Sequence, residues 1–212
     1  SPFFQRPLEL GARLSLSSTT KYVNGHSDCL GGVVVTNDES WNDRMIFSQK
    51  AVGLNPSPFD AWLVTRGIKT LAVRMRQHHA NALAIAERLE GYGRVKWIRH
   101  PFLPSHPQFE LAKRQMSGGS GIVTLELDAD LEATKAFASK LTLFALAESL
   151  GGVESLIDHP ASMTHASIPR AEREKVGIYD GLVRLSVGIE DVEDLMADLD
   201  QAFSDAGLST SN

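Results

Sequence analysis

The chain has 212 residues, of which 42% are hydrophobic, and its net charge of −5 comes from 21 basic and 26 acidic side chains. This composition is that of a globular protein with one large domain or two small ones, without the basic runs typical of nucleic-acid or membrane binding. No apolar stretch approaches the roughly 18 residues that would cross a bilayer. A single cysteine, Cys29, excludes an internal disulfide framework and indicates a reducing compartment, so we expect a cytoplasmic protein.

The first third of the chain is predicted to contain short strands and helices. Alternating apolar and polar residues at 14–17 predict a strand, and the β-branched run at 32–36 predicts a second. Residues 41–52 have the mixed amphipathic spacing of a helix, which Gly53 would end.

A long helical pattern follows. Ser57 suits its N-cap and Pro58 its first position, and apolar residues keep a 3.6-residue period as far as Leu89. Gly67 interrupts the pattern, so we expect two helices end to end, with a domain boundary at this point.

The rest of the chain is predicted to interleave strands and helices. We expect strands at 95–98, 122–127, 143–147 and 182–187, helices at 108–116, 131–141 and 192–206, and no regular structure at 208–212. This order predicts a small α/β or α+β domain with helices on one face of its sheet.

The most informative segment is residues 17–32, which read S-S-T-T-K-Y-V-N-G-H-S-D-C-L-G-G. Hydroxyl groups bind phosphate oxygens, and a lysine amine forms imines with carbonyl compounds. Pyridoxal 5′-phosphate is a ligand that needs both groups within a few residues. The nucleotide-binding pattern G-x-x-x-x-G-K-[ST] is absent, since these glycines follow the lysine.

Other interpretations of this segment stay open on the residues alone. A Ser/Thr cluster before a lysine is also typical of an exposed turn. A metal site is not expected, because the spacing of His26, Asp28 and Cys29 does not match that of a structural zinc site. The polar residues after the lysine are expected to fix the loop rather than to touch substrate: Tyr22, Asn24, His26 and Asp28.

The longer string S-x-T-K-Y-x-x-G-H-S-D-x-x-G-G resembles the cofactor-lysine signature of the Cys/Met-metabolism enzymes that use pyridoxal phosphate. The resemblance continues through P-S-P-F-D-A-W-L, A-E-S-L-G-G-V-E-S-L, H-P-A-S-M-T-H-A and R-L-S-V-G-I-E-D. It implies an α/β fold of type I. Residues 1–67 would end the cofactor-binding large domain, and residues 68–212 would form the small C-terminal α/β (α+β) domain with its long linking helix.

The resemblance also implies roles for the residues of the signature. Lys21 would bind the aldehyde of pyridoxal 5′-phosphate and, once released, act as the catalytic base. Ser18 and Thr20 match the family's phosphate-binding hydroxyls. In an extended segment these two residues face the same way, so both could reach one phosphate.

Arg184 lies in a mainly apolar predicted strand, where a buried guanidinium needs an anion. A structural ion pair would satisfy it, and so would a carboxylate ligand. The resemblance implies the second role, in which Arg184 binds the substrate α-carboxylate beside Ser149. It also places Glu148 at the distal part of the substrate pocket and Thr164 at the pocket wall.

The implied reaction is bond breaking or exchange at Cβ or Cγ of a sulfur amino acid. Elimination from cystathionine would give cysteine, 2-oxobutanoate and ammonia. The alternative is replacement on an activated homoserine by cysteine, the synthase reaction. Leu150 argues against the β-lyases, which tend to carry an aromatic residue at this position.

The resemblance finally bears on the partners of the chain. Its first residues enter the family pattern near the middle of the pattern, so we expect a C-terminal half whose partner is the missing N-terminal half. Such a half could be inert alone. The family implies a homotetramer acting on a small sulfur amino acid.

Overall fold

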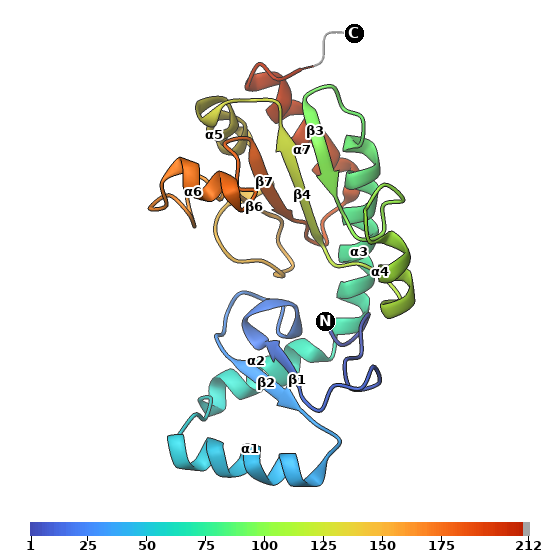
Figure 1. Cartoon of the computed structure of the whole chain (residues 1–212), viewed down its shortest axis with the longest axis vertical. Helices are drawn as coiled ribbons and strands as arrows, with labels where there is room; N and C mark the ends of the chain where they lie inside the picture. The colour runs from blue at the N-terminus through green and yellow to red at the C-terminus, as the bar shows by residue number, and fades with distance from the viewer. Residues whose placement is uncertain (210–212) are drawn as a thin grey trace.

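The computed structural model describes residues 1–209 and shows two parts joined by the long helix α3 (Figure 1). In chain order its elements are β1 (Ser15–Ser18), η1 (Thr19–Val23), β2 (Gly32–Val35), α1 (Glu39–Val52), α2 (Pro58–Ile68), α3 (Leu71–Leu89), β3 (Val95–Arg99), α4 (Phe109–Gln115), β4 (Ile122–Leu127), α5 (Leu131–Lys140), β5 (Ala145–Leu146), β6 (Leu156–Asp158), α6 (Arg170–Lys175), β7 (Leu182–Ser186) and α7 (Val192–Asp205). None of the helices in the described range combines the length and apolarity needed to cross a membrane.

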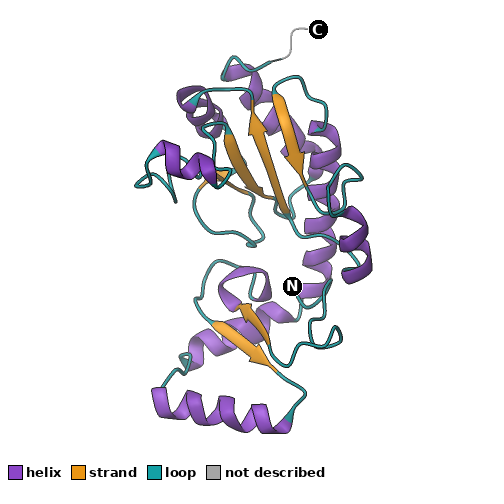
Figure 2. Ribbon diagram, viewed as in Figure 1, coloured by secondary structure: helices purple, strands orange, loops and turns teal. Residues whose placement is uncertain are grey.

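The larger part is a five-stranded sheet in the order β3-β4-β7-β6-β5, antiparallel except for the pair β5–β6. Helices α3, α5 and α7 cover one face of this sheet (Figure 2). Because side chains alternate along a strand, every second residue of β4 and β7 enters the core beneath these helices. Val123, Leu125, Val183 and Leu185 are such residues, and each is almost fully buried.

The same alternation puts the polar residues of these strands on the opposite face of the sheet. Arg184 of β7 lies between Thr124 of β4 and Asp158 of β6 in the strand register. A charged residue is therefore compatible with this apolar strand, because it points away from the hydrophobic core.

The smaller part contains the antiparallel pair β1–β2, whose register sets Ser18 opposite Gly32. This pairing folds the glycines at 31–32 back beside the turn η1. Helix α1 buries no side chain, and α2 buries only Gly67. Packing inside this part is thus slight.

Most of the predicted elements are confirmed. Ser57 caps α2 by accepting the N–H of Asp60 at 3.0 Å, and Gly53 ends α1 with a left-handed φ of 77°. The long helical pattern divides as predicted, since α2 ends at Ile68 and α3 begins at Leu71.

Three expectations need correction. The strand predicted at 143–147 is only Ala145–Leu146, because the carboxylate of Asp198 takes the N–H groups of Leu143 and Phe144. Leu208 is buried in the core, while residues 210–212 lie outside the described part of the chain. Strand β6 and helix α6 were not predicted from the sequence, because both are short and lack a periodic pattern.

Candidate active site

Lys21 lies in the turn η1, directly after β1, and its side chain points toward the sheet part of the molecule. Its backbone departs from helical geometry, with φ −100° and ψ −140°. The Nζ atom donates to Oγ of Ser149 at 2.7 Å. Ser149 itself has a φ of 83°, an unfavourable conformation for a residue with a side chain, and such strain is concentrated at functional sites.

The hydroxyls of Ser18 and Thr20 lie on the same side of the turn. Both donate to the carbonyl oxygen of Gly31, at 3.5 and 3.4 Å, and Thr20 Oγ1 also accepts the Gly31 N–H at 3.0 Å. The two donated bonds are long, so these hydroxyls can turn to an anion. Only Ser18 belongs to the strand, so the shared direction of the two side chains comes from the turn as well as from the pleat.

The loop after Lys21 is fixed by its own polar side chains, as predicted. Asn24 Nδ2 donates to Asp28 Oδ1 at 2.6 Å, and the His26 ring bonds the Asn24 carbonyl at 2.8 Å. Tyr22 connects the turn to the sheet part, because its hydroxyl accepts the N–H of Gly121 at 3.0 Å. Burial raises the pKa of Tyr22 to about 12, so it remains a neutral phenol at neutral pH.

Arg184 reaches the same place from the sheet. Its Nη2 donates to the Ser149 carbonyl at 2.9 Å and lies 3.3 Å from Oδ2 of the buried Asp158. The ion pair lacks directed hydrogen bonds, and Arg184 Nε has no hydrogen-bond partner within residues 1–209. Burial raises the pKa of Asp158, the Arg184 guanidinium opposes this rise, and the Glu148 carboxylate adds to it.

Asp158, which pairs with Arg184, is a residue of the candidate site that was not predicted from the sequence. It directly follows the apolar pair Leu156-Ile157. A predicted strand there would have placed Asp158 on the face opposite the buried Ile157. The register that sets it beside Arg184 is a long-range property, which only the folded sheet supplies.

A cleft of about 650 Å³ opens between the two parts of the molecule at this point. It is lined by Thr20, Ser27, Asp28, Cys29, Leu30, Asp60, Ala147, Glu148, Ser149, Glu154 and Leu156. The predicted residues Thr20, Glu148 and Ser149 therefore meet in one cleft. Thr164 does not line it, since its exposed hydroxyl pairs with the ring of His165.

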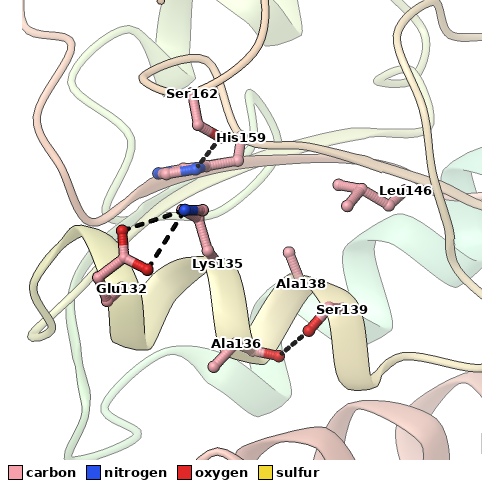
Figure 3. A pocket seen from close by; sticks show the side chains of 8 residues that line it. All are labelled: Glu132, Lys135, Ala136, Ala138, Ser139, Leu146, His159 and Ser162. Carbon is pink, nitrogen blue, oxygen red and sulfur yellow. Dashed lines mark hydrogen bonds and ion pairs between the residues drawn. The ribbon is translucent and has the colours of Figure 1, made fainter.

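A second hollow of about 340 Å³ lies between α5 and the segment after β6 (Figure 3). Its polar groups are already engaged: both ring nitrogens of His159 have partners, Ser162 Oγ at 2.7 Å and the Asp180 carbonyl at 2.8 Å. Lys135 pairs with Glu132 at 3.0 Å. The hollow holds none of the predicted site residues, so the cleft at Ser149 is the better candidate.

Comparison with known proteins gives the same family along nearly the whole chain. A family model described as Cys/Met metabolism PLP-dependent enzyme matches residues 1–204. The cystathionine gamma-lyase of Dictyostelium discoideum is 53% identical over 203 residues, which are 96% of this chain and 52% of that protein. The cystathionine beta-lyase of Coxiella burnetii is 53% identical over 204 residues, 96% of this chain and 53% of that protein.

A solved structure agrees with these sequences. The crystal structure of cystathionine gamma synthase from Xanthomonas oryzae pv. oryzae, in complex with aminoacrylate and cysteine, is 50% identical with a TM-score of 0.93. It is matched over 99% of this chain and 54% of its own. The chain thus spans about half the length of the relatives it matches, and its mixed α/β fold is a partial domain of the type I fold. The chain belongs to the Cys/Met metabolism family of PLP-dependent enzymes.

Proposed function

We propose that the chain carries part of the active site of a pyridoxal-phosphate-dependent carbon–sulfur lyase. The reaction would be α,γ-elimination on cystathionine, which with one molecule of water gives cysteine, 2-oxobutanoate and ammonia. Support comes from relatives named cystathionine gamma-lyase, including the human protein at 52% identity over 206 residues, 97% of this chain and 51% of that protein.

The observation that carries the proposal is the meeting of Lys21 and Arg184 at one residue. Ser149 accepts from the Lys21 amine through its hydroxyl and from the Arg184 guanidinium through its carbonyl, at 2.7 and 2.9 Å. An amine that can take a proton and a guanidinium that can bind a carboxylate are thereby fixed near each other. A bound carboxylate next to this amine would bring the Cα proton of an α-amino acid within reach of the base.

The residues of the turn fit the proposed cofactor. The hydroxyls of Ser18 and Thr20 point to one side with weak internal bonds, which suits a phosphate, and the Lys21 amine follows them directly. Pyridoxal phosphate, when bound, supplies an electron sink for a carbanion at the substrate Cα. Ser18 and Thr20 would hold its phosphate, and Lys21 would hold its aldehyde.

The chain's own residues then orient the substrate and move its protons. Arg184 binds the α-carboxylate, and Asp158 and the Ser149 carbonyl keep the guanidinium in place. Lys21 removes the Cα proton and afterwards a Cβ proton. Ser149 Oγ lies within hydrogen-bond distance of the amine and stabilises it in that position. Glu148, on the cleft wall, carries a charge suited to a cationic distal group of the substrate.

The products decide among three activities, because relatives with all three names are similar to this chain. The complete enzyme would be incubated with cystathionine, and the oxo acid identified by chromatography. We expect 2-oxobutanoate; pyruvate would indicate β-elimination instead. Turnover of an activated homoserine with cysteine, without lysis of cystathionine, would establish the synthase reaction. Borohydride reduction followed by digestion should place the cofactor on the peptide that contains Lys21.

A second candidate function is that of an assembly half that is inactive by itself. The part formed by β1, β2, α1 and α2 leaves large apolar side chains in water, among them Leu16, Leu30 and Phe47, which are 76%, 80% and 73% exposed. Exposed apolar surface of this kind indicates a partner. The relatives contain about as much additional polypeptide as this chain, and we propose that the equivalent segment covers this surface in a homotetramer.

Two measurements separate the candidates. The chain alone would be mixed with pyridoxal phosphate and scanned for imine absorbance in the visible range. The scan would be repeated with the complete protein, whose molar mass light scattering would give. A band only in the complete protein would support the assembly half, and a band in both would show that this chain holds the cofactor by itself.

A further inference from the structure

Arg74 of α3 is a buried cation that the proposed function does not use. Its side chain is 3% exposed, and it donates to neutral oxygens. Nη1 bonds the Tyr22 carbonyl at 2.8 Å, Nη2 bonds the carbonyls of Gly67 at 2.9 Å and Val23 at 3.4 Å, and Nε bonds Thr70 Oγ1 at 3.0 Å. Within residues 1–209 it makes no ion pair. Burying a charge without a counter-ion costs free energy. The hydrogen bonds that Arg74 makes are therefore the reason we infer for its burial.

Two glycines leave room for this arrangement. Gly25 has a φ of 78°, and a Cβ atom there would lie 2.0 Å from Nη1 of Arg74. Gly67 lies against the turn itself, since its Cβ would lie 2.3 Å from the carbonyl oxygen of Asn24. The backbone therefore closes tightly around the guanidinium. Any larger residue at these positions would push Arg74 or the turn aside.

The groups that Arg74 holds come from three segments that meet at the site. The carbonyls of Tyr22 and Val23 directly follow Lys21, the Gly67 carbonyl lies in the last turn of α2, and Thr70 directly precedes α3. The turn needs such support, because the non-helical φ and ψ of Lys21 interrupt its regular helical geometry. Hydrogen bonds to a charged donor are about twice as strong as neutral ones.

We propose that Arg74 is a positioning residue of the site: it ties the backbone after Lys21 to the junction of α2 and α3, so that the Lys21 amine stays at Ser149. The inference rests on the proposed role of Lys21, but its structural half can be tested without cofactor. Arg74 touches neither the amine nor the Ser149 hydroxyl in the structure, so it acts through the main chain.

The first test measures amide exchange in the chain itself. Arg74→Gln keeps polarity but loses the charge and most of the donors, and the exposed Arg76→Gln on the same helix is the matched control. Removing hydrogen bonds of this strength should speed exchange of the Asn24 and Gly25 amides about tenfold, with β4 and β7 amides unchanged. Unchanged exchange in the turn would overturn the proposal.

A milder variant covers the case in which Arg74→Gln unfolds the whole chain. Thr70→Val removes the oxygen that accepts from Nε, while the guanidinium and its carbonyl partners remain. We expect about a threefold increase in exchange at Asn24 and Gly25, again confined to the turn. If the increase is absent, or is equal in the sheet, Arg74 has no specific hold on the turn and the proposal fails.

The second test uses the cofactor-loaded enzyme. Arg74→Gln should lower kcat about tenfold per borohydride-trapped Lys21, with KM for cystathionine within about threefold, and Arg74→Lys should recover part of the loss. Activity per trapped lysine equal to that of the wild type would reduce Arg74 to a purely structural role and overturn the proposal. If the wild type itself gives no label at Lys21, the proposed function fails, while amide exchange still decides whether Arg74 holds the turn.

Discussion

The two parts of this molecule are stabilised in different ways. The sheet part contains a continuous core of buried apolar side chains between residues 82 and 208, whereas the small cluster beside η1 has, within residues 1–209, three buried members, Tyr22, Leu71 and Met75. Helix α1 buries nothing. Apolar burial is the dominant favourable term in folding. The sheet part should therefore hold its structure by itself. The smaller part, which contains η1 and is called the turn part below, should depend on its contacts with other segments.

The candidate site lies at the seam, by which we mean the contact between the two parts, where residues 21–25 meet Gly121, Ser149 and Val153. The N–H of Val153 donates to the Gly25 carbonyl at 2.9 Å, and the N–H of Gly121 donates to the Tyr22 hydroxyl at 3.0 Å. The rigid sheet thus supplies the frame against which the turn with Lys21 is set. A functional residue on a weakly packed segment can still be held in a precise position when that segment contacts a well-packed one.

The largest expected effect comes from truncating one phenylalanine in each part. Phe203→Ala removes a fully buried ring that packs against Phe137 and Tyr92, and should lower the free energy of unfolding by about 3–5 kcal/mol. Phe47→Ala, at a 73% exposed position of α1, should change it by at most about 0.5 kcal/mol. Urea denaturation of both variants measures the difference. Similar losses would contradict the contrast between the two parts.

Asp198 stabilises the sheet part through hydrogen bonds rather than burial of apolar surface. Its carboxylate accepts the backbone N–H groups of Thr142, Leu143 and Phe144, and also the Thr142 hydroxyl. Asp198→Ala should cost about 2–3 kcal/mol, because it leaves these donors without an acceptor. Thr142→Val, which removes only the hydroxyl, is the matched control and should lose less in the same urea titration.

The same residue predicts a pH dependence. Burial would raise the pKa of Asp198, but the hydrogen bonds from residues 142–144 outweigh it, and its pKa lies below the ordinary value. A group with a lowered pKa stabilises the fold above its unfolded pKa, and this contribution is lost as the pH falls through the folded pKa. As the pH is lowered below about 4, the urea concentration at the unfolding midpoint of the wild type should therefore decrease. It should decrease more steeply with pH than the midpoint of Asp198→Ala. Equal slopes would refute this origin.

The features that could be predicted from the sequence are local, and those that could not be predicted depend on long-range contacts. Caps such as Ser57 and the strand carrying Arg184 were predictable, because their signals lie within a few residues. The shortening of β5 was not, since it depends on Asp198, more than fifty residues away in the chain. At the site, the motif indicated Lys21, Ser18 and Thr20, while Asp158 and Arg74 became visible only through register and packing.

A smaller effect is expected at the seam itself. Gly151 has a φ of 80°, and a Cβ atom there would lie 2.9 Å from the backbone nitrogen of Tyr22. Gly151→Ala should therefore cost about 2 kcal/mol and loosen the contact between the turn and the sheet. Gly207→Ala carries similar backbone strain, at φ 69°, but meets no atom within 4 Å. An equal loss in both variants would show that the seam adds nothing beyond backbone strain.

The smallest effect tests whether the turn part relies on local bonds. Ser57 Oγ accepts the N–H of Asp60 at 3.0 Å, and Ser57→Ala should cost about 1 kcal/mol of helix stability. Because α2 buries only Gly67, this loss should appear as local fraying and not as global unfolding. Hydrogen exchange should rise at the first amides of α2 while β4 and β7 stay protected. A uniform rise across the chain would mean that both parts unfold as one cooperative unit. Packing between the two parts would then matter more than the difference in the size of their apolar cores.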